Sequence, residues 1–286
     1  MIWIYGRFLK KPETSNIIFY IKPFQGPNAE FGPWELRINA MYINTTGLVL
    51  RETKYKDSSK ILTVLTGHEG KLTVNVRGAL RRNSKLAAVS QILVFSEMTL
   101  FKNRDRWTLN EGQLLEEFAG LRDDIVLLAL GSYFAELTEA VADEDSPSPE
   151  ILPLALNALY ALSHGIKPPE HIKPAFELRL MAASGFRPLI THCAVCRREN
   201  PEQSFLDFSG GTLRCADCGG TSQAEASLSA GALQAMRYII SCEPKKLFSF
   251  TLGDETRREL SAAAQGYLLA HLDRRFRTLE YYNQLV

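Results

Sequence analysis

The alternation of apolar and polar residues between Thr45 and Phe118 predicts a series of short β-strands. Five segments rich in β-branched and aromatic residues are separated by polar or turn-forming residues, and they cover 45–53, 60–67, 70–79, 90–102 and 106–118. A hairpin-sized loop joins the second segment to the third, and the longer basic loop 79–89 joins the third to the fourth. This pattern favours a five-stranded oligonucleotide-binding (OB) barrel, with an SH3-like barrel and a split sheet as structural alternatives.

Beyond Phe118 the spacing of apolar residues becomes helical. One helical face carries Ile125, Leu128, Ala129, Ser132, Tyr133 and Leu137. The acidic, turn-rich stretch 143–150 interrupts the pattern, and helices are then predicted at 150–163, 174–184, 229–240 and 254–276. Gly165 and Gly185 follow two of these helices, as helix ends favour, and Asp254 is the predicted N-cap of the last one.

The predicted fold class is therefore α+β and multidomain. An OB barrel at 41–118 is followed by an α-helical domain at 119–286, into which a metal-binding knuckle at 190–221 is inserted. Residues 1–40 differ from the rest because prolines and glycines separate their aromatic residues without a sustained period. We expect either a poorly ordered extension upstream of an ordinary start at Met41, or an aromatic arm that packs on the body or on a partner.

Four of the five cysteines form two C-x2-C pairs separated by eighteen residues, Cys193 with Cys196 and Cys215 with Cys218. This spacing is typical of a zinc site in which two tight turns aim four thiolates at one point. Four thiolates leave no coordination position for a water, so the sequence predicts one structural Zn²⁺ rather than a catalytic one. His192 is an alternative ligand or an exposed neighbour, and the isolated Cys242 is interpreted as a small buried hydrophobe.

Composition excludes several classes of protein. A chain that is 45% hydrophobic and 23% charged is neither disordered nor fibrous, and no apolar run is long enough to span a membrane. The first residues lack the features of a secretion signal, so a cytoplasmic location with reduced thiols is expected. The sequence contains no nucleophile elbow, no HExxH motif and no phosphate-binding glycine loop, which predicts that the protein is not an enzyme.

The net charge of +1 conceals an excess of basic residues in the predicted barrel. Residues 71–107 contain eight lysines and arginines but only two acidic residues. Seven of these cations and one aromatic residue form the candidate DNA-binding set: Arg77, Arg81, Arg82, Lys85, Lys102, Arg104, Arg106 and Trp107. Cations on barrel loops displace counterions from phosphates, and aromatic rings stack on unpaired bases. The alternative is that the charges are simply solvated and that Trp107 and Tyr55 belong to the barrel core.

Two segments resemble the RecO family of bacterial DNA repair proteins. One is the N-terminal barrel segment from Met41, with the pattern K-x-T-V-x-x-R-G-A at Lys71–Ala79, and the other is FELRLMAASGFRPLITHCAVC, which leads into the cysteines. The resemblance runs from Met41 to near the end of the chain. It implies a recombination mediator that binds single- and double-stranded DNA and anneals complementary strands. It also implies action with RecR to load RecA on gaps coated by single-strand-binding protein, and a nucleoid-associated, cytoplasmic location.

In the same family the helical domain has a groove for the C-terminal tail of single-strand-binding protein, for which Arg179 and Arg274 are candidate residues here. Two other function classes compete with this interpretation. One is a hydrolase or ligase with a catalytic zinc, which the four-thiolate set argues against. The other is a zinc-ribbon adaptor that holds a repair or transcription complex together and contacts DNA only weakly.

Overall fold

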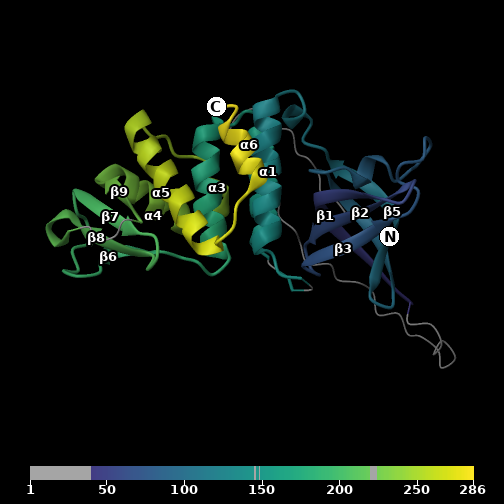
Figure 1. Cartoon of the computed structure of the whole chain (residues 1–286), viewed down its shortest axis with the longest axis horizontal. Helices are drawn as coiled ribbons and strands as arrows, with labels where there is room; N and C mark the ends of the chain where they lie inside the picture. Colours follow the sequence, from purple (N-terminus) through teal and green to yellow (C-terminus); the bar gives the residue numbers. More distant parts are fainter. Residues whose placement is uncertain (1–39, 145, 148, 220–223) are drawn as a thin grey trace.

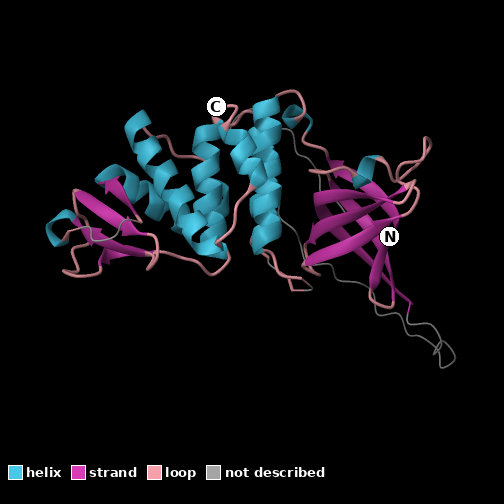
Figure 2. Cartoon of the chain, viewed as in Figure 1, coloured by secondary structure: helices cyan, strands magenta, loops and turns pink. Residues whose placement is uncertain are grey.

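The computed structural model describes residues 40–144, 146–147, 149–219 and 224–286, so the extension predicted for residues 1–40 lies almost entirely outside them. A barrel stands at one end of the molecule, helices fill the middle, and a small sheet forms the other end (Figure 1). Figure 2 shows strands at both ends and helices between them. The predicted α+β fold class is confirmed.

In the described part of the chain, five strands close into a barrel in the order β1-β2-β3-β5-β4. Their bounds are β1 Ala40–Tyr55, β2 Ser59–Thr66, β3 Lys71–Val76, β4 Phe95–Asn103 and β5 Arg106–Glu116. β3 and β5 are parallel, whereas the other neighbours are antiparallel. This is the Greek-key order of an OB barrel, and its closure excludes the split sheet.

Strand β1 is long because it pairs with β4 in its first half and with β2 in its second half. The two halves meet near Gly47, where a side chain would collide with Val64, so a glycine is needed for the strand to bend across the barrel. A register shift between Val49 and Arg51 follows. The bend and the shift allow one strand to serve both sides of the closed sheet.

The helices are α1 Ile125–Val141, α2 Ile151–Ser163, α3 Pro169–Ala183, α4 Ala230–Ser241, α5 Asp254–Leu272 and α6 Arg277–Asn283. The Asp124 carboxylate accepts the backbone N–H groups of Val126 and Leu127 and caps α1. Gly165 follows α2 in the left-handed conformation that favours glycine. The helices predicted at 150–163 and 229–240 are therefore confirmed to within a residue at each end.

Three details of the helix prediction are wrong. α3 begins at Pro169, and Pro174 lies inside it because the buried residues Ile172 and Phe176 outweigh one missing hydrogen bond. Gly253, rather than Asp254, is the N-cap of α5, and the Asp254 carboxylate instead accepts from the Arg257 guanidinium at 2.9 Å.

The third error concerns the end of α5, which was predicted to continue to Phe276. Asp273 adopts a left-handed conformation with φ 41° and ends α5. The chain turns there, and Phe276 is buried edge-on against Tyr133 at a ring-centroid distance of 5.9 Å. Burial of this ring favours the separate helix α6 over a longer α5.

The cysteine region is a small sheet rather than an isolated knuckle. In the described part, strands β6 Leu189–Cys193, β7 Gln203–Asp207, β8 Thr212–Cys215 and β9 Glu225–Ser229 form a sheet in the order β6-β8-β7-β9. The sequence did not predict these strands, and β9 lies beyond the predicted boundary at residue 221. The sheet continues directly into α4, whose N-cap is Ser229.

A buried ion pair holds the helices together around α3. The Lys173 ammonium lies 2.8 Å from the Glu177 carboxylate, and both side chains are almost fully buried. The Tyr133 hydroxyl of α1 donates to Glu177 at 2.7 Å, while Lys173 donates to Gln265 of α5 at 2.9 Å. Burial, followed by the neighbouring Glu177 charge, raises the pKa of Tyr133 well above its usual value.

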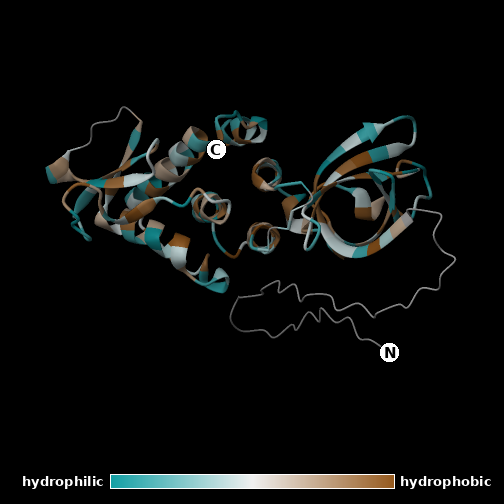
Figure 3. Cartoon of the chain, turned by 90° about the horizontal axis from the view of Figure 1, so that it is seen from below, coloured by the Kyte–Doolittle hydropathy of each residue, from teal (hydrophilic) through white to brown (hydrophobic). Residues whose placement is uncertain are grey.

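The barrel has a core of its own and also contributes residues to the hydrophobic core of the helices. Val49 of β1 points into the barrel, whereas its neighbours Leu48 and Leu50 join the core that contains the buried faces of α1, α2 and α3. Phe118, at the end of the predicted barrel domain, is fully buried in the same core. Figure 3 shows hydrophobic stretches in the barrel strands and in the nearby helices. The barrel is therefore packed against the helical domain rather than tethered to it.

Polar contacts reinforce this junction. The Lys71 backbone donates to the Asp143 carbonyl at 3.1 Å, and its ammonium donates to the Glu139 carbonyl at 3.0 Å. Arg51 forms an ion pair with the Glu139 carboxylate at 2.9 Å. The acidic segment after α1 thus lies against one end of the barrel. Among the described helices, none is long and apolar enough to cross a bilayer.

We predict that Leu50→Ala lowers the free energy of unfolding by about 2–5 kcal/mol, because it opens a cavity in the shared core. Urea denaturation followed by both far-UV circular dichroism and tryptophan fluorescence checks this, and the two signals should stay coincident. Leu50 is 2% exposed, so Leu114→Ala, at a residue that is 39% exposed on β5, is the matched control with little expected effect. Two separated transitions, with Leu50→Ala shifting only the barrel's, would contradict a shared core.

Candidate nucleic-acid interface and metal centre

The four cysteines of the two C-x2-C pairs converge on one point. Cys193 ends β6, Cys196 lies in the following turn, Cys215 ends β8, and Cys218 closes a short 3-10 helix. Their Sγ atoms all lie within 4.8 Å of one another. Sulfurs around a tetrahedral zinc, each about 2.3 Å from the ion, are about 3.8 Å apart. The group therefore could hold a metal ion.

Local backbone geometry brings the sulfurs together. The Arg197 N–H donates to the Cys193 carbonyl at 3.0 Å and closes the first turn, with Arg197 itself at φ 64°. Gly219 has φ 74° directly after the second pair, a conformation that glycine adopts readily. The Cys215 N–H points at the Cys193 Sγ at 3.4 Å and links the two turns.

The thiols differ in how readily they ionise. At Cys193 burial opposes ionisation, but the backbone N–H groups of Cys196, Cys215 and Val195 outweigh burial and lower the pKa to about 6. At Cys218, hydrogen bonds with the thiols of Cys215 and Cys196 raise the pKa to about 12. Cys193 therefore loses its proton more readily than Cys218.

Neither His192, the alternative ligand, nor the isolated Cys242 belongs to the converging group. The His192 Nδ1 lies 2.9 Å from the Thr191 hydroxyl. Cys242 follows α4 as its C-cap and is only half-buried, so it is less enclosed than predicted.

The first set of predicted DNA-binding residues lies at the end of β3 and in the loop after it. We call Arg77, Arg81, Arg82 and Lys85 the loop cluster, and all four residues are exposed. The loop is held against the β1–β2 turn, since the Leu80 N–H donates to the Ser58 carbonyl at 3.0 Å. Gly78, at φ 68°, lets the chain turn back so that the Arg81 side chain passes close to it.

The second set lies at the turn between β4 and β5. We call Lys102, Arg104 and Arg106 the hairpin cluster, of which Arg104 and Arg106 are exposed. Lys102 is half-buried because its ammonium sits over the Trp107 ring, 5.0 Å from the centroid. Trp107 itself is 6% exposed and belongs to the barrel core, so its ring is not accessible to a base. We therefore correct its predicted role to support of Lys102 by a cation–π contact.

The register between β3 and β5 gives the relative position of the loop cluster and the hairpin cluster. Val74 pairs with Trp107 in the parallel β3–β5 ladder, so Thr73 is level with Arg106. Because Val74, Val76 and Trp107 point into the barrel, the alternating Arg77 and Arg106 point outwards on the same face. Arg77 lies four residues beyond Thr73, which is about 13 Å along the strand. The clusters thus share an outer face without touching.

Sequence reasoning missed the β1–β2 turn. Lys54 and Lys56 are exposed beside the loop cluster, and Tyr55 is 41% exposed, so the alternative that places Tyr55 in the barrel core does not hold. The Lys56 ammonium lies 5.4 Å from the centre of the Tyr55 ring. The sequence KYK at 54–56, which lies where β1 leads into β2, could have identified this turn as a candidate contact with DNA. OB barrels bind oligonucleotides with the β1–β2 turn and with the β4–β5 turn.

The loop cluster and the hairpin cluster differ from other cations of the barrel in that they form no ion pair with described residues. Lys60 pairs with Glu52 at 2.8 Å, and Arg51 pairs with Glu139. No member of the loop cluster or the hairpin cluster forms an ion pair with any residue in the described ranges. Their charges are therefore the ones available to an external anion.

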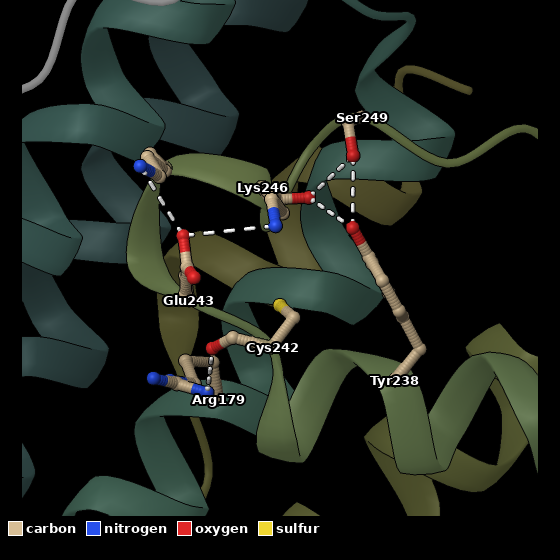
Figure 4. A network of polar contacts seen from close by, with 7 residues as sticks. Arg179, Tyr238, Cys242, Glu243, Lys246 and Ser249 are labelled. Atoms are coloured by element: carbon tan, nitrogen blue, oxygen red, sulfur yellow. Dashed lines mark hydrogen bonds and ion pairs between the residues drawn. The ribbon is translucent and has the colours of Figure 1, made fainter.

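Arg179, a candidate for the tail-binding groove, is used inside the helical domain instead. Its guanidinium donates to the carbonyls of Ile239, Ile240 and Cys242 at 2.9–3.2 Å and caps α4, as Figure 4 shows for Cys242. Figure 4 also shows the Tyr238 hydroxyl bound to the Lys246 carbonyl and to Ser249, which fixes the following turn.

Arg274, the other candidate for that groove, lies between α5 and α6 rather than beside Arg179. Its guanidinium carbon is 5.0 Å from the centre of the Phe276 ring, and its nitrogen is 3.7 Å from the Glu136 carboxylate. The structure therefore does not bring the two arginines into one site.

Comparisons with known proteins agree with this architecture. Residues 41–118 match the family described as Recombination protein O N terminal, and residues 122–280 match Recombination protein O C terminal. The chain is 32% identical over 250 residues to DNA repair protein RecO of Symbiobacterium thermophilum, covering 86% of this chain and 98% of that protein. It is 29% identical over 244 residues to DNA repair protein RecO of Acetivibrio thermocellus, covering 85% and 97%.

A third relative, DNA repair protein RecO of Caldicellulosiruptor bescii, is 30% identical over 240 residues, which cover 84% of this chain and 97% of that protein. The matched segments span the barrel, the helices and the cysteine sheet. The chain therefore belongs to the recombination protein O (RecO) family.

Proposed function

We propose that the chain is a DNA repair protein of the recombination mediator type. It binds single- and double-stranded DNA through the barrel, anneals complementary strands, and with RecR helps to load RecA onto gaps coated by single-strand-binding protein. Family membership supports the repair role, since the relatives above are named DNA repair protein RecO. The single observation that carries the DNA-binding role is the pair of cationic clusters on one barrel face that have no ion-pair partner among the described residues.

Annealing by this surface needs no bond chemistry. Two complementary strands repel each other through their phosphates, and cations that contact both backbones lower that repulsion and release condensed counterions. Clusters about 13 Å apart along the same face offer two separate points of contact. The base edges are left free for pairing, because the clusters are built from cations that bind phosphate regardless of sequence.

We further infer that the four cysteines hold one Zn²⁺ with a structural role. Four thiolates suit zinc and complete its tetrahedral shell, so no position is open for a reacting water. The ion would join β6 to β8, whose parallel ladder has only two paired positions. The sheet in turn contacts α5, where the Phe208 ring lies against Gly266 and the Glu259 carboxylate accepts the Ser229 N–H.

The Arg81→Ala, Arg82→Ala double variant should bind single-stranded oligonucleotides more weakly, with a shallower dependence on salt. Loss of two phosphate contacts lowers the slope of log K against log salt by about 1.4 for a single strand. Fluorescence anisotropy at several salt concentrations measures this slope. Lys245→Ala with Lys246→Ala, which removes two exposed cations beyond α4, is the matched control and should leave the slope unchanged. An unaltered slope in the Arg81/Arg82 variant would remove the loop cluster from the interface.

The full-length protein should anneal complementary oligonucleotides without ATP, both bare and coated with single-strand-binding protein. A fluorescence-quenching annealing assay checks this, and the Arg81/Arg82 double variant should be slower because the two backbones repel each other more strongly. The competing adaptor function predicts weak DNA contact and no acceleration over spontaneous annealing, so such a result would favour the adaptor.

Cys193→Ser should reduce bound zinc from about one equivalent per chain to near zero, and it should lower the melting temperature of the cysteine sheet. Elemental analysis and differential scanning calorimetry provide the two measurements. The matched control is Cys242→Ser, which removes the cysteine outside the group and should retain the metal. Full metal content in Cys193→Ser would show that this thiol is not a ligand.

A further inference from the structure

A pair of aromatic residues lies on the outer face of the barrel. Tyr42 of β1 pairs across the ladder with Phe101 of β4, and their ring centroids are 4.8 Å apart at an interplanar angle of 42°. Tyr42 is 62% exposed, which makes it the most exposed aromatic residue in the described part of the chain. Phe101 is half-buried, so Tyr42 is the ring that offers most of its surface to solvent, and an exposed ring backed by a second one points to a binding role.

The alternation of the two strands fixes where these rings point. Thr45 of β1 and Leu100 of β4 are buried in the barrel, so Tyr42 and Phe101 project to the outside. The next outward pair along the ladder is polar, and the Thr99 hydroxyl donates to the Asn44 side chain at 2.9 Å. The aromatic pair is therefore a bounded apolar platform rather than part of a larger hydrophobic surface.

The platform adjoins the hairpin cluster. Phe101 pairs with Thr108 of β5, and Arg106 lies two residues before Thr108, so the Arg106 side chain projects on the same outer face. Lys102 lies over Trp107 on the inner side, and Arg104 is exposed in the turn that joins β4 to β5. A ligand seated on the rings would thus be within reach of cations on the adjoining turn. The combination of ring faces with neighbouring positive charge is complementary to a chain of unpaired bases joined by phosphates.

We propose, on the basis of the DNA-binding function above, that Tyr42 and Phe101 form a stacking platform for unpaired bases and that the hairpin cluster holds the flanking phosphates. Bases in a duplex are already stacked on their neighbours and cannot lie on these rings, so the platform is selective for single strands. Tyr55, at the other end of the same face, is less suitable because Lys56 lies over its ring.

The dimensions of the face fit a short single-stranded site. From Tyr42 on β1 the outer surface passes over β4 and β5 to β3, which ends at the loop cluster. Three spacings between neighbouring strands amount to about 14 Å. A strand that starts on the platform and ends at the loop cluster would therefore occupy a site near the lower limit of about 4 nucleotides per OB barrel. The two clusters would then contact phosphates at either end of one site.

The test compares Tyr42→Ala with Tyr42→Phe in the full-length protein, using a short oligo-dT and a blunt duplex of equal length. Tyr42→Ala should weaken oligo-dT binding at least about fivefold, the equivalent of 1 kcal/mol for one stacked base, and leave duplex binding unchanged. Tyr42→Phe should bind like the wild type because it keeps the ring. Phe101→Leu, which keeps apolar bulk without an aromatic face, should also lose oligo-dT binding. Asn44→Ala, one outward position further along β1, is the matched control.

The failures of the two proposals are distinguishable. If the wild type binds neither oligo-dT nor duplex, the DNA-binding function itself is wrong. If the wild type binds both and Tyr42→Ala binds oligo-dT equally well, only the stacking platform is overturned. Equal weakening of oligo-dT and duplex binding in Tyr42→Ala would also overturn it, because stacking on an exposed ring affects only unpaired bases.

Discussion

The arrangement of the whole molecule depends on strand β1 serving two hydrophobic cores at once. Val49 fills the barrel, and Leu48 and Leu50 on either side of it are buried against the helices. A strand whose side chains alternate between two buried environments cannot rotate or slip without exposing one set of them. The barrel is consequently fixed on the helical domain in one orientation. The loop cluster and the hairpin cluster are then presented on barrel turns and on an outer face that these apolar contacts leave open.

Charge is distributed in the same way as hydrophobic contact. Where the barrel meets the helical domain, the Glu139 carboxylate neutralises Arg51, and the main-chain carbonyls of Glu139 and Asp143 accept hydrogen bonds from the Lys71 ammonium and the Lys71 backbone N–H. Farther along the strands, the exposed cations have no ion-pair partner among the described residues. A net charge of +1 for the chain therefore conceals two kinds of cation. The paired ones hold the domains together, while the unpaired ones produce a local field that attracts polyanions.

The sequence predicted those features that depend on local spacing. The cysteine group and the barrel strands are each defined by residues close together in the chain. The errors arise where tertiary packing decides. Trp107 and Tyr55 both lie near hairpin turns, where alternation alone does not tell which ring closes the barrel and which is left outside. Pro174 was predicted to start a helix because its missing N–H disfavours a helix interior, but the buried apolar face of α3 outweighs that cost. The outward face that joins Tyr42, Phe101 and Arg106 appears only once strand register is known.

The cysteine group is connected to the barrel through a series of packed elements. The cysteine sheet and the barrel occupy opposite ends of the molecule, with the helices between them (Figure 1). The sheet contacts α5, which packs on α3, and the buried Lys173–Glu177 pair of α3 is bound to α1 through Tyr133. Helix α1 belongs to the core that receives Leu48 and Leu50 of the barrel. Loss of a metal ion from the cysteine group would therefore loosen the far end first, and its effect would reach the cationic clusters only through the stability of this chain of packed elements. Coupling of this kind acts through the population of locally unfolded states rather than through a change in the geometry of the cationic clusters.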